Sequence, residues 1–124
     1  MKVKHLSFLV LLVAMLGCNQ DEENLQALDG AYRGIFVRDQ QAVKVELSFD
    51  NGTYQGYSER YKFPALCRGT YTVLRNKITF ANDCAWTAEF DWTLILSGDW
   101  NFDLTGSLLI LTHANGDKYT LTRQ

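Results

Sequence analysis

Apolar and polar residues alternate over short segments of this chain, with the spacing of β-strands rather than of helices. The clearest case is residues 43–50, where odd positions are apolar and even positions polar, as in a strand with one face buried and the other in water. No long segment has the period of an amphipathic helix. Similar β-rich segments predict strands over residues 31–38, 43–50, 53–58, 68–74, 77–81, 93–97, 100–104, 108–113 and 118–123.

Turn residues separate these segments. Asp50-Asn51-Gly52 and Ala114-Asn115-Gly116-Asp117 are short connections in which Asn and Gly accept the positive φ that hairpins need. Eight or nine strands joined in this way favour an all-β fold, an antiparallel up-and-down β-barrel of about eight strands, because closure removes the sheet edges. In the hairpin centred on Arg75-Asn76 we expect inward-facing side chains at residues 71, 73, 78 and 80. The unbroken apolar run at 108–113 predicts burial on both faces.

The first 18 residues have the pattern of an exported protein. Lys2 and Lys4 precede an apolar run that ends at Leu16, which is the order of a signal peptide over residues 1–17; a buried core helix is the alternative. The stretch Met15-Leu16-Gly17-Cys18 resembles the lipobox of bacterial lipoproteins. This resemblance implies that Cys18 becomes the first residue of the mature chain and carries diacylglycerol and an acyl chain such as palmitate, which would anchor the protein in the bacterial outer membrane.

The rest of the chain divides into a tether and a domain. Residues 18–27 are expected to form a lipidated, acidic tether, and residues 28–124 a single barrel domain. Residues 19–24 contain three like charges and no apolar residue, so they favour a solvated linker. An acidic run after the lipidated cysteine also resembles the surface-export signal of Bacteroidetes lipoproteins, so the periplasmic and the cell-surface locations both stay open.

Net charge argues against a nucleic-acid partner. The precursor has 12 Lys and Arg against 14 Asp and Glu. Removal of Lys2 and Lys4 with the signal peptide leaves 10 against 14, a formal charge of −4. Nucleic-acid binding favours clustered Lys and Arg, which this composition does not provide.

Two cysteines remain once Cys18 is assigned to the lipid, and an oxidising compartment favours their pairing. A hairpin centred on Arg75-Asn76 pairs residue i with residue 151 − i, which places Cys67 opposite Cys84. The expected distance between their Cα atoms is then about 5.5 Å, as a disulfide requires. No further Cys or His lies near enough in the sequence to complete a metal site.

Both ends of the predicted barrel domain carry a family resemblance. Leu28-Asp29-Gly30-Ala31-Tyr32 resembles the Gly-x-Trp entry of the lipocalin and calycin group, with Tyr32 in place of the usual Trp. In that group an Arg near the end of the last strand packs on this aromatic ring, a role that the resemblance assigns to Arg123. Residues 28–123 are also similar in outline to the lipocalin-like lipoproteins of Bacteroidetes. Three stretches give this similarity: Phe49-Asp50-Asn51-Gly52-Thr53-Tyr54, Gly69-Thr70-Tyr71 and Tyr119-Thr120-Leu121.

The sequence offers little catalytic or metal-binding chemistry. His113 is the only histidine that remains after cleavage, and no partner at recognisable spacing supports a role as general base. Asp99-Trp100-Asn101-Phe102-Asp103 begins like a calcium loop, but Leu104 stands where that loop needs Gly. We therefore expect a protein that is not an enzyme and holds no metal or cofactor.

Aromatic residues gather in the segment 86–92. Trp86, Phe90 and Trp92 would lie near the barrel mouth, with Trp100 added from the next expected strand. They could form a hydrophobic plug that closes the barrel, or a rim that binds a ligand or a protein partner, since aromatic side chains dominate binding hot spots.

Two functions follow from these alternatives. The first is an outer-membrane-anchored lipoprotein whose barrel binds a small apolar or amphipathic ligand in its interior. The second is a protein-binding barrel, such as a lysozyme or protease inhibitor, in which an exposed loop carries the activity. An empty interior favours the first function, and a packed interior with a protruding loop favours the second.

Overall fold

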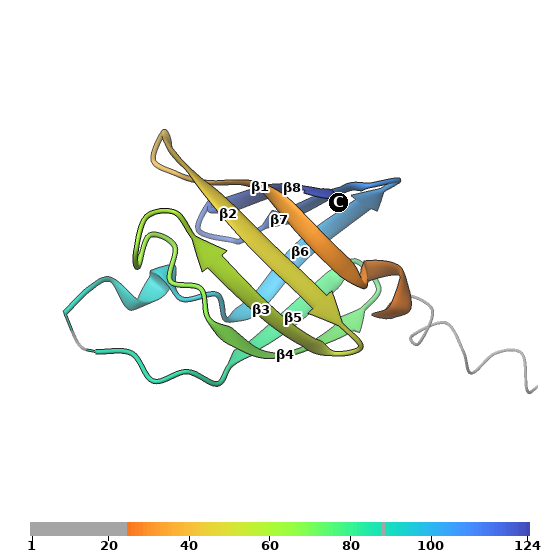
Figure 1. Ribbon diagram of the computed structural model, residues 1–124, viewed down its shortest axis with the longest axis horizontal. Coiled ribbons are helices and arrows are strands. Elements are labelled where there is room, and N and C mark those ends of the chain that lie inside the picture. Colours follow the sequence, from red (N-terminus) through yellow and green to blue (C-terminus); the bar gives the residue numbers. More distant parts are fainter. Residues whose placement is uncertain (1–24, 88) are drawn as a thin grey trace, which may run out of the picture.

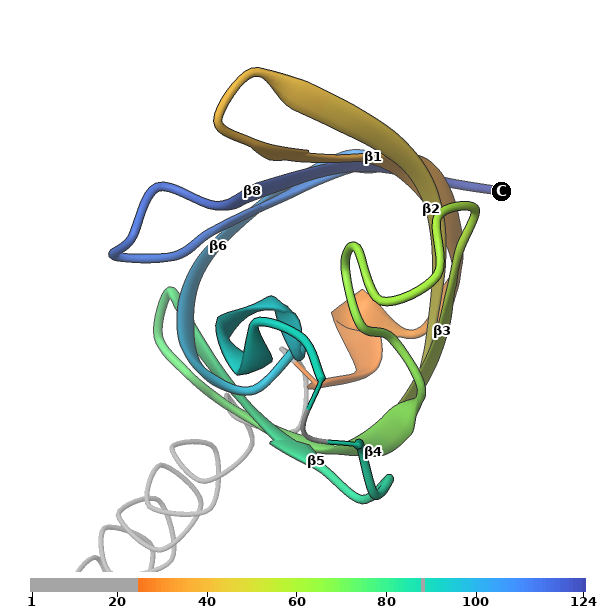
Figure 2. The same cartoon turned by 90° about the vertical axis from the view of Figure 1, so that its left-hand side faces the viewer.

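The computed structural model describes residues 25–87 and 89–124, and these form a closed antiparallel barrel of eight strands. Each strand pairs with the next along the chain, and the last pairs with the first (Figures 1 and 2). The prediction of an all-β, up-and-down barrel is therefore confirmed. The strands are β1 (Gly30–Arg38), β2 (Gln41–Asp50), β3 (Thr53–Ser58), β4 (Arg68–Leu74), β5 (Lys77–Asn82), β6 (Gly98–Thr105), β7 (Leu108–Thr112) and β8 (Lys118–Arg123).

The two ends of the barrel differ. A single helical turn at residues 25–28 lies at one end, together with the short turns 51–52, 75–76 and 106–107 (Figure 1). Its Leu28 side chain is fully buried, and Asp29 Oδ1 accepts a hydrogen bond of 2.8 Å from the backbone N of Asn51. The opposite end contains the long connections 59–67 and 83–97. We call the first the tether end, because the chain enters the barrel there, and the second the loop end.

Two glycines allow strands to approach more closely than any side chain would. A Cβ atom on Gly34 of β1 would lie 1.9 Å from the carbonyl oxygen of Thr120, and one on Gly69 of β4 would lie 2.0 Å from that of Ala81. Such contacts are sterically forbidden, so only glycine fits. A glycine inside a strand commonly marks such a close approach of two backbones.

Side chains fill the barrel interior. Alternate residues of every strand point inward and form one continuous buried cluster, which includes Tyr71, Val73, Ile78 and Phe80 as predicted. Aromatic rings occupy much of this space; for example, the centroids of Phe49 and Tyr71 are 5.2 Å apart. Burial raises the pKa of Tyr54 to about 12, as expected for a phenol in an apolar interior. Four hollows of the described part of the chain lie outside this core, on the outer wall and at the loop end.

Two local predictions were wrong. Residues 93–97 are not a strand: a 3₁₀ helix, η1 (Trp92–Leu94), begins there because the side chain of Asp91 accepts the backbone N–H of Thr93. Beyond it, Ile95 makes only an isolated bridge to Ala65. The run 108–113 is not buried on both faces either. Leu109 and Leu111 point inward, whereas Leu108 is 39% exposed, since a barrel wall is a single layer with solvent outside.

None of the helices in residues 25–87 and 89–124 is long and apolar enough to cross a membrane. The expected signal peptide, residues 1–17, and Cys18 lie outside the described residues.

Replacing Trp100 with Ala should destabilise the barrel by about 3–5 kcal/mol, because the buried indole would leave a cavity. The matched control is Trp92→Ala, which removes an exposed indole and should change stability by less than about 0.5 kcal/mol. Urea unfolding of both variants measures the difference. Equal losses for the two variants would contradict the assignment of Trp100 to the core.

Candidate functional site

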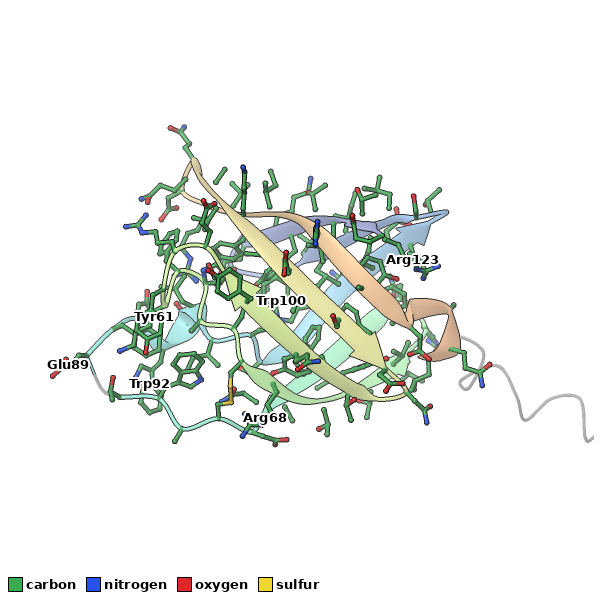
Figure 3. The ribbon with its side chains drawn as sticks, viewed as in Figure 1. Tyr61, Arg68, Glu89, Trp92, Trp100 and Arg123 are labelled. Carbon is green, nitrogen blue, oxygen red and sulfur yellow. A yellow bond between two sulfur atoms is a disulfide. The ribbon has the colours of Figure 1, made fainter. Side chains whose placement is uncertain are left out.

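The two long connections lie side by side over the loop end of the barrel (Figures 2 and 3). The backbone N of Ala65 donates a 3.0 Å hydrogen bond to the carbonyl oxygen of Leu94, and the backbone N of Leu96 donates one of 3.3 Å to that of Ala65. Below them, the ring of Phe63 packs on Phe36 with centroids 5.9 Å apart. The mouth is therefore closed by Phe63, Pro64, Ala65, Leu94 and Leu96.

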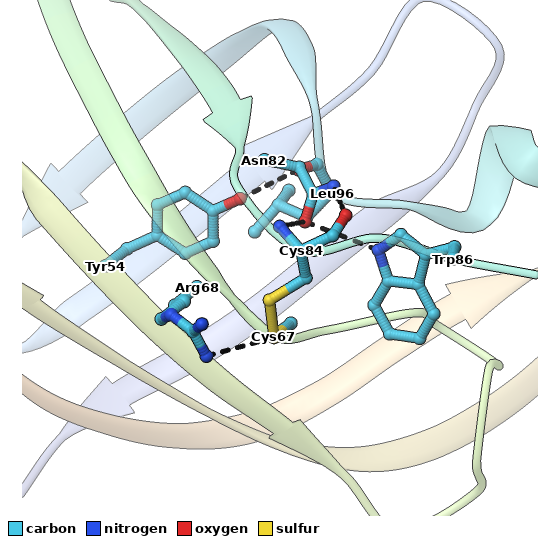
Figure 4. Close-up of a disulfide and its surroundings, with 7 residues drawn as sticks. All are labelled: Tyr54, Cys67, Arg68, Asn82, Cys84, Trp86 and Leu96. Carbon is cyan, nitrogen blue, oxygen red and sulfur yellow. Dashed lines mark hydrogen bonds between the residues drawn. A yellow bond between two sulfur atoms is a disulfide. The ribbon is translucent and has the colours of Figure 1, made fainter.

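A disulfide joins the roots of these connections, since Cys67 precedes β4 and Cys84 follows β5 (Figure 4). The pairing of Gly69 with Asn82 has the predicted register, because 69 + 82 equals 151. The predicted disulfide is thus present, and a cross-link of this loop size contributes about 3 kcal/mol on the chain-entropy account. The side chain of Asn82 adds hydrogen bonds to the carbonyl oxygen of Cys84 (2.7 Å) and from the indole N–H of Trp86 (3.3 Å).

The most exposed aromatic side chains of the loop end are Tyr61 and Trp92, at 78% and 55% (Figure 3). Trp86 and Phe90 are half-buried and contact each other, with centroids 5.7 Å apart. Trp92 donates its indole N–H to the carbonyl oxygen of Thr87 over 3.1 Å. Three of the four predicted rim residues therefore gather at the loop end, and Trp92 projects furthest into solvent.

Trp100 lies in the core instead of the rim. It is 4% exposed and packs on Tyr119, with centroids 5.3 Å apart. The physical reason is strand alternation, because Trp100, Phe102 and Leu104 share the inward face of β6. That pattern was a usable signal in the sequence. The sequence reasoning also missed Tyr61, whose segment 59–67 has no periodicity to indicate which side chains point outward.

Lys62 links the two long connections. Its ammonium donates a 2.8 Å hydrogen bond to Thr87 Oγ1 and lies 4.9 Å from the centroid of Phe90 and 5.3 Å from that of Tyr61. The backbone of Lys62 has φ of +61°, a left-handed conformation that is unusual for a residue with a side chain. These contacts hold Tyr61 next to the aromatic segment of the other connection.

Arg38, at the end of β1, fixes the connection 83–97 to the barrel. Its guanidinium donates to both carboxylate oxygens of Asp117 (2.7 and 2.5 Å), to Asp91 (3.2 Å) and to the carbonyl oxygen of Thr93 (3.3 Å). Asp117 is the only buried charged residue in the described part of the chain. Its hydrogen bond raises the pKa of Arg38 above the ordinary value, against the opposing effect of burial. This pair thereby positions η1 and Trp92.

At the tether end, Arg123 contacts Tyr32. The guanidinium donates two hydrogen bonds to the phenol oxygen, of 3.1 and 2.6 Å, and its carbon lies 5.3 Å from the ring centroid. Arg123 also bonds to the carbonyl oxygen of Ala27, and the Tyr32 hydroxyl donates to that of Leu28 over 2.9 Å. These bonds tie the last strand and the helical turn to β1.

The residues that the sequence analysis weighed as a general base or a calcium ligand, His113 and Asp99, contact neighbouring side chains of the barrel. The His113 ring packs on Trp100 with centroids 4.9 Å apart, and its Nδ1 accepts the backbone N–H of Asn115. Asp99 accepts a 2.7 Å hydrogen bond from Thr79 Oγ1 and lies 3.8 Å from the Lys77 ammonium. Across residues 25–87 and 89–124, no three His, Cys, Asp or Glu side chains are placed to hold a metal ion.

Neither a protein-family model nor a curated protein matches this chain. The closed eight-stranded antiparallel barrel is consistent with a lipocalin-like fold. The structure of the loop end is therefore the main source for an inference about function.

Acidification should release Trp92 from its position. Hydrogen bonds from Thr93, with a smaller effect of the Arg38 charge, hold the pKa of Asp91 below its ordinary value of 3.8. These contacts are fully present above pH 3.8 and are lost as the pH falls through the lowered pKa. The indole resonance of Trp92 should shift in that range, while that of Trp100 stays fixed. An identical shift in Asp91→Asn would contradict this origin.

Proposed function

We propose that this protein is a lipocalin-like lipoprotein of the Bacteroidetes type, held to the outer membrane through Cys18, which binds another protein through the loop end of its barrel. One observation carries the proposal. Tyr61 and Trp92 remain exposed at the end of a barrel whose interior is filled and whose mouth is already closed by other side chains. Neither aromatic ring is needed to complete the core.

The loop end has the physical properties of a protein-binding surface. Exposed Trp and Tyr side chains are the most frequent anchors of protein interfaces. A rigid surface loses less conformational entropy on binding, and three independent links restrain this one: the Cys67–Cys84 disulfide, the Arg38–Asp117 pair and the contacts of Lys62. We favour a bound lysozyme or protease that this protein inhibits. The loop end would then cover the active-site cleft of that enzyme.

The position of the tether supports this assignment. The described chain begins with the helical turn at residue 25, at the end opposite the two long connections (Figure 1). A lipid on Cys18 would leave residues 18–24 as a tether that spans at most about 25 Å when extended. The loop end would then face away from the membrane that carries the protein, where a soluble or surface-bound partner can reach it.

A small apolar or amphipathic ligand is the second candidate, and a groove on the outer wall supports it. This groove has a volume of about 580 Å³ and lies across β1, β2 and β3, beside the exposed ring of Tyr57 and the side chain of Ile35. Native mass spectrometry of the purified protein distinguishes the two candidates, because a retained ligand would add its mass.

The anchor is tested by metabolic labelling with an alkyne-bearing fatty acid. We expect a labelled mature protein that begins at Cys18. Cys18→Ser should carry no label and should retain its N-terminal segment, since the lipid would have no sulfur to bind. Unlabelled native protein that still begins with Met1 would contradict the anchor without affecting the loop-end assignment.

Protein binding is tested by photo-cross-linking in the native cells. A benzophenone amino acid in place of Tyr61 should give a discrete protein adduct, because that side chain would lie within the interface. The matched control is the same substitution at Leu74, which is also exposed (63%) but lies at the tether end. Adducts of equal yield from both positions, or none from position 61, would refute the proposal.

A further inference from the structure

Two hollows lie next to each other on the outer wall of the barrel, over β2, β3 and the beginning of β4. Their volumes are about 390 and 340 Å³, and Ser48, Gln55 and Arg68 line both of them. The two hollows therefore form one continuous depression, which we call the wall groove. It lies on the side of the barrel, whereas Tyr61 and Trp92 lie at the loop end.

The strand register places the polar side chains of the wall groove in rows. Ser48 pairs with Gln55 and Gln55 with Arg68, so these residues cross β2, β3 and β4 in a line. Arg68, at the β4 end of this row, is exposed (Figure 3). The next row toward the tether end contains Thr53 and Thr70. Partners within a row have Cβ atoms about 5 Å apart, and successive rows are about 7 Å apart along a strand.

Several of these side chains have hydrogen-bonding groups without a partner inside the protein. In the part of the chain that the structure describes, the side chains of Ser48, Gln55 and Thr70 make no hydrogen bond, and the Arg68 guanidinium makes only a long contact of 3.9 Å with the Cys67 sulfur. Hydroxyl and carboxamide groups both donate and accept, and a guanidinium donates. The wall groove is therefore suited to a ligand with many hydroxyl groups.

Charge around the wall groove is close to balanced. The charged residues that line it and the adjoining groove beside Ile35 are the cations Arg33, Lys44 and Arg68 and the carboxylates Glu46, Asp50, Glu59 and Asp83. Their formal charge is 3 − 4 = −1, and Arg60, which follows Glu59 directly, brings it to zero. Arg33 Nε also lies 3.2 Å from Glu46 Oε1. A ligand therefore gains little here from a net charge of either sign.

Tyr57 provides an apolar platform at one end of the wall groove. Its ring is 64% exposed and lies opposite Glu46 in the register of β2 and β3. Within residues 25–87 and 89–124, it is the only exposed aromatic side chain on a strand. A flat aromatic ring can cover the apolar C–H face of a sugar ring, because its body is apolar and its edge stays in contact with water. The sugar hydroxyl groups then remain free for hydrogen bonds.

We propose that the wall groove binds a neutral oligosaccharide, an inference that goes beyond the proposed function because it concerns the side of the barrel and not the loop end. One sugar ring stacks on Tyr57, and hydroxyl groups of the next sugars bond to the row of Ser48, Gln55 and Arg68. Tyr57 and Thr53 are four residues apart on β3, which is about 13 Å and matches about two or three linked sugar rings.

Other extended ligands fit the wall groove less well. A nucleic acid requires clustered cations for its phosphates, and the balanced charge does not supply them. A peptide that adds a strand requires a free sheet edge. At the wall groove β3 lies between β2 and β4 and pairs with both. An oligosaccharide needs neither feature, because its hydroxyl groups bond to side chains.

The experiment measures binding of defined sugars to the full mature protein by isothermal titration calorimetry. The detergent is lauryldimethylamine oxide, because a detergent with a sugar head group would compete. The probes are cellohexaose, maltohexaose, laminarihexaose, mannohexaose and N-acetylated chitohexaose, and the hexamer of galacturonic acid is the anionic control. We expect at least one neutral probe to bind with a dissociation constant below about 1 mM, and the anionic hexamer to bind at least about tenfold more weakly than that probe. Raising the salt from 50 to 300 mM should change the dissociation constant of the neutral probe by less than about twofold.

Three variants locate the interaction. Tyr57→Ala should weaken binding of the neutral probe at least about tenfold, since the stacking platform is lost. Gln55→Ala should weaken it about three- to tenfold through the loss of hydrogen bonds. The matched control is Tyr61→Ala, which removes an equally exposed ring at the loop end and should leave the affinity within about twofold. All three side chains are exposed, so unchanged urea unfolding curves should show that the variants remain folded.

The outcomes separate this inference from the proposed function. Failure of every neutral hexasaccharide to bind would overturn the inference, as would equal binding of the anionic hexamer. Sugar binding that tolerates Tyr57→Ala, or that is lost in Tyr61→Ala, would also overturn it, because the sugar would then bind elsewhere. Each of these results leaves the cross-link at position 61 unaffected. Loss of that cross-link with sugar binding intact would refute the proposed function alone.

Discussion

Closure of a small sheet on itself is the constraint on which the rest of this structure depends. Eight strands with strict inward and outward alternation leave an interior that their own side chains fill. The close backbone contacts at Gly34 and Gly69 permit adjacent strands to bend toward each other. Because the wall has no free edge and the interior has little room, a binding function has to be placed on the outer wall or at one of the ends.

The loop end shows how a rigid barrel supports long connections. Residues 59–67 and 83–97 have few regular backbone hydrogen bonds, yet several kinds of interaction fix them. A covalent bond joins their roots at Cys67 and Cys84, an ion pair at Arg38 holds η1, and the Lys62 ammonium connects their aromatic side chains. Each interaction acts at a different point, so the surface that includes Tyr61 and Trp92 is positioned along its length rather than at a single hinge.

Sequence reasoning succeeded where period-2 alternation controls the structure and failed where contacts distant in sequence do. Alternation predicted the fold, and with the turn at residues 75–76 it gave the register that places Cys67 by Cys84. Residues 93–97 have strand-like composition, but two hydrogen bonds stabilise a 3₁₀ turn there instead. The Asp91 side chain accepts the backbone N–H of Thr93, and the backbone N–H of Ala65 donates to the carbonyl oxygen of Leu94. The exposure of Tyr61 depends on how two connections pack together, which no local pattern encodes.

Some aromatic residues at the loop end pack against other side chains, whereas Tyr61 and Trp92 are exposed to solvent. Phe63 and Leu96 already close the mouth, and Trp86 and Phe90 pack partly against neighbouring side chains. An exposed Trp or Tyr adds little to the stability of the folded state and increases the risk of non-specific association. An aromatic surface that is held rigid and left uncovered is therefore better explained by a partner than by the requirements of folding.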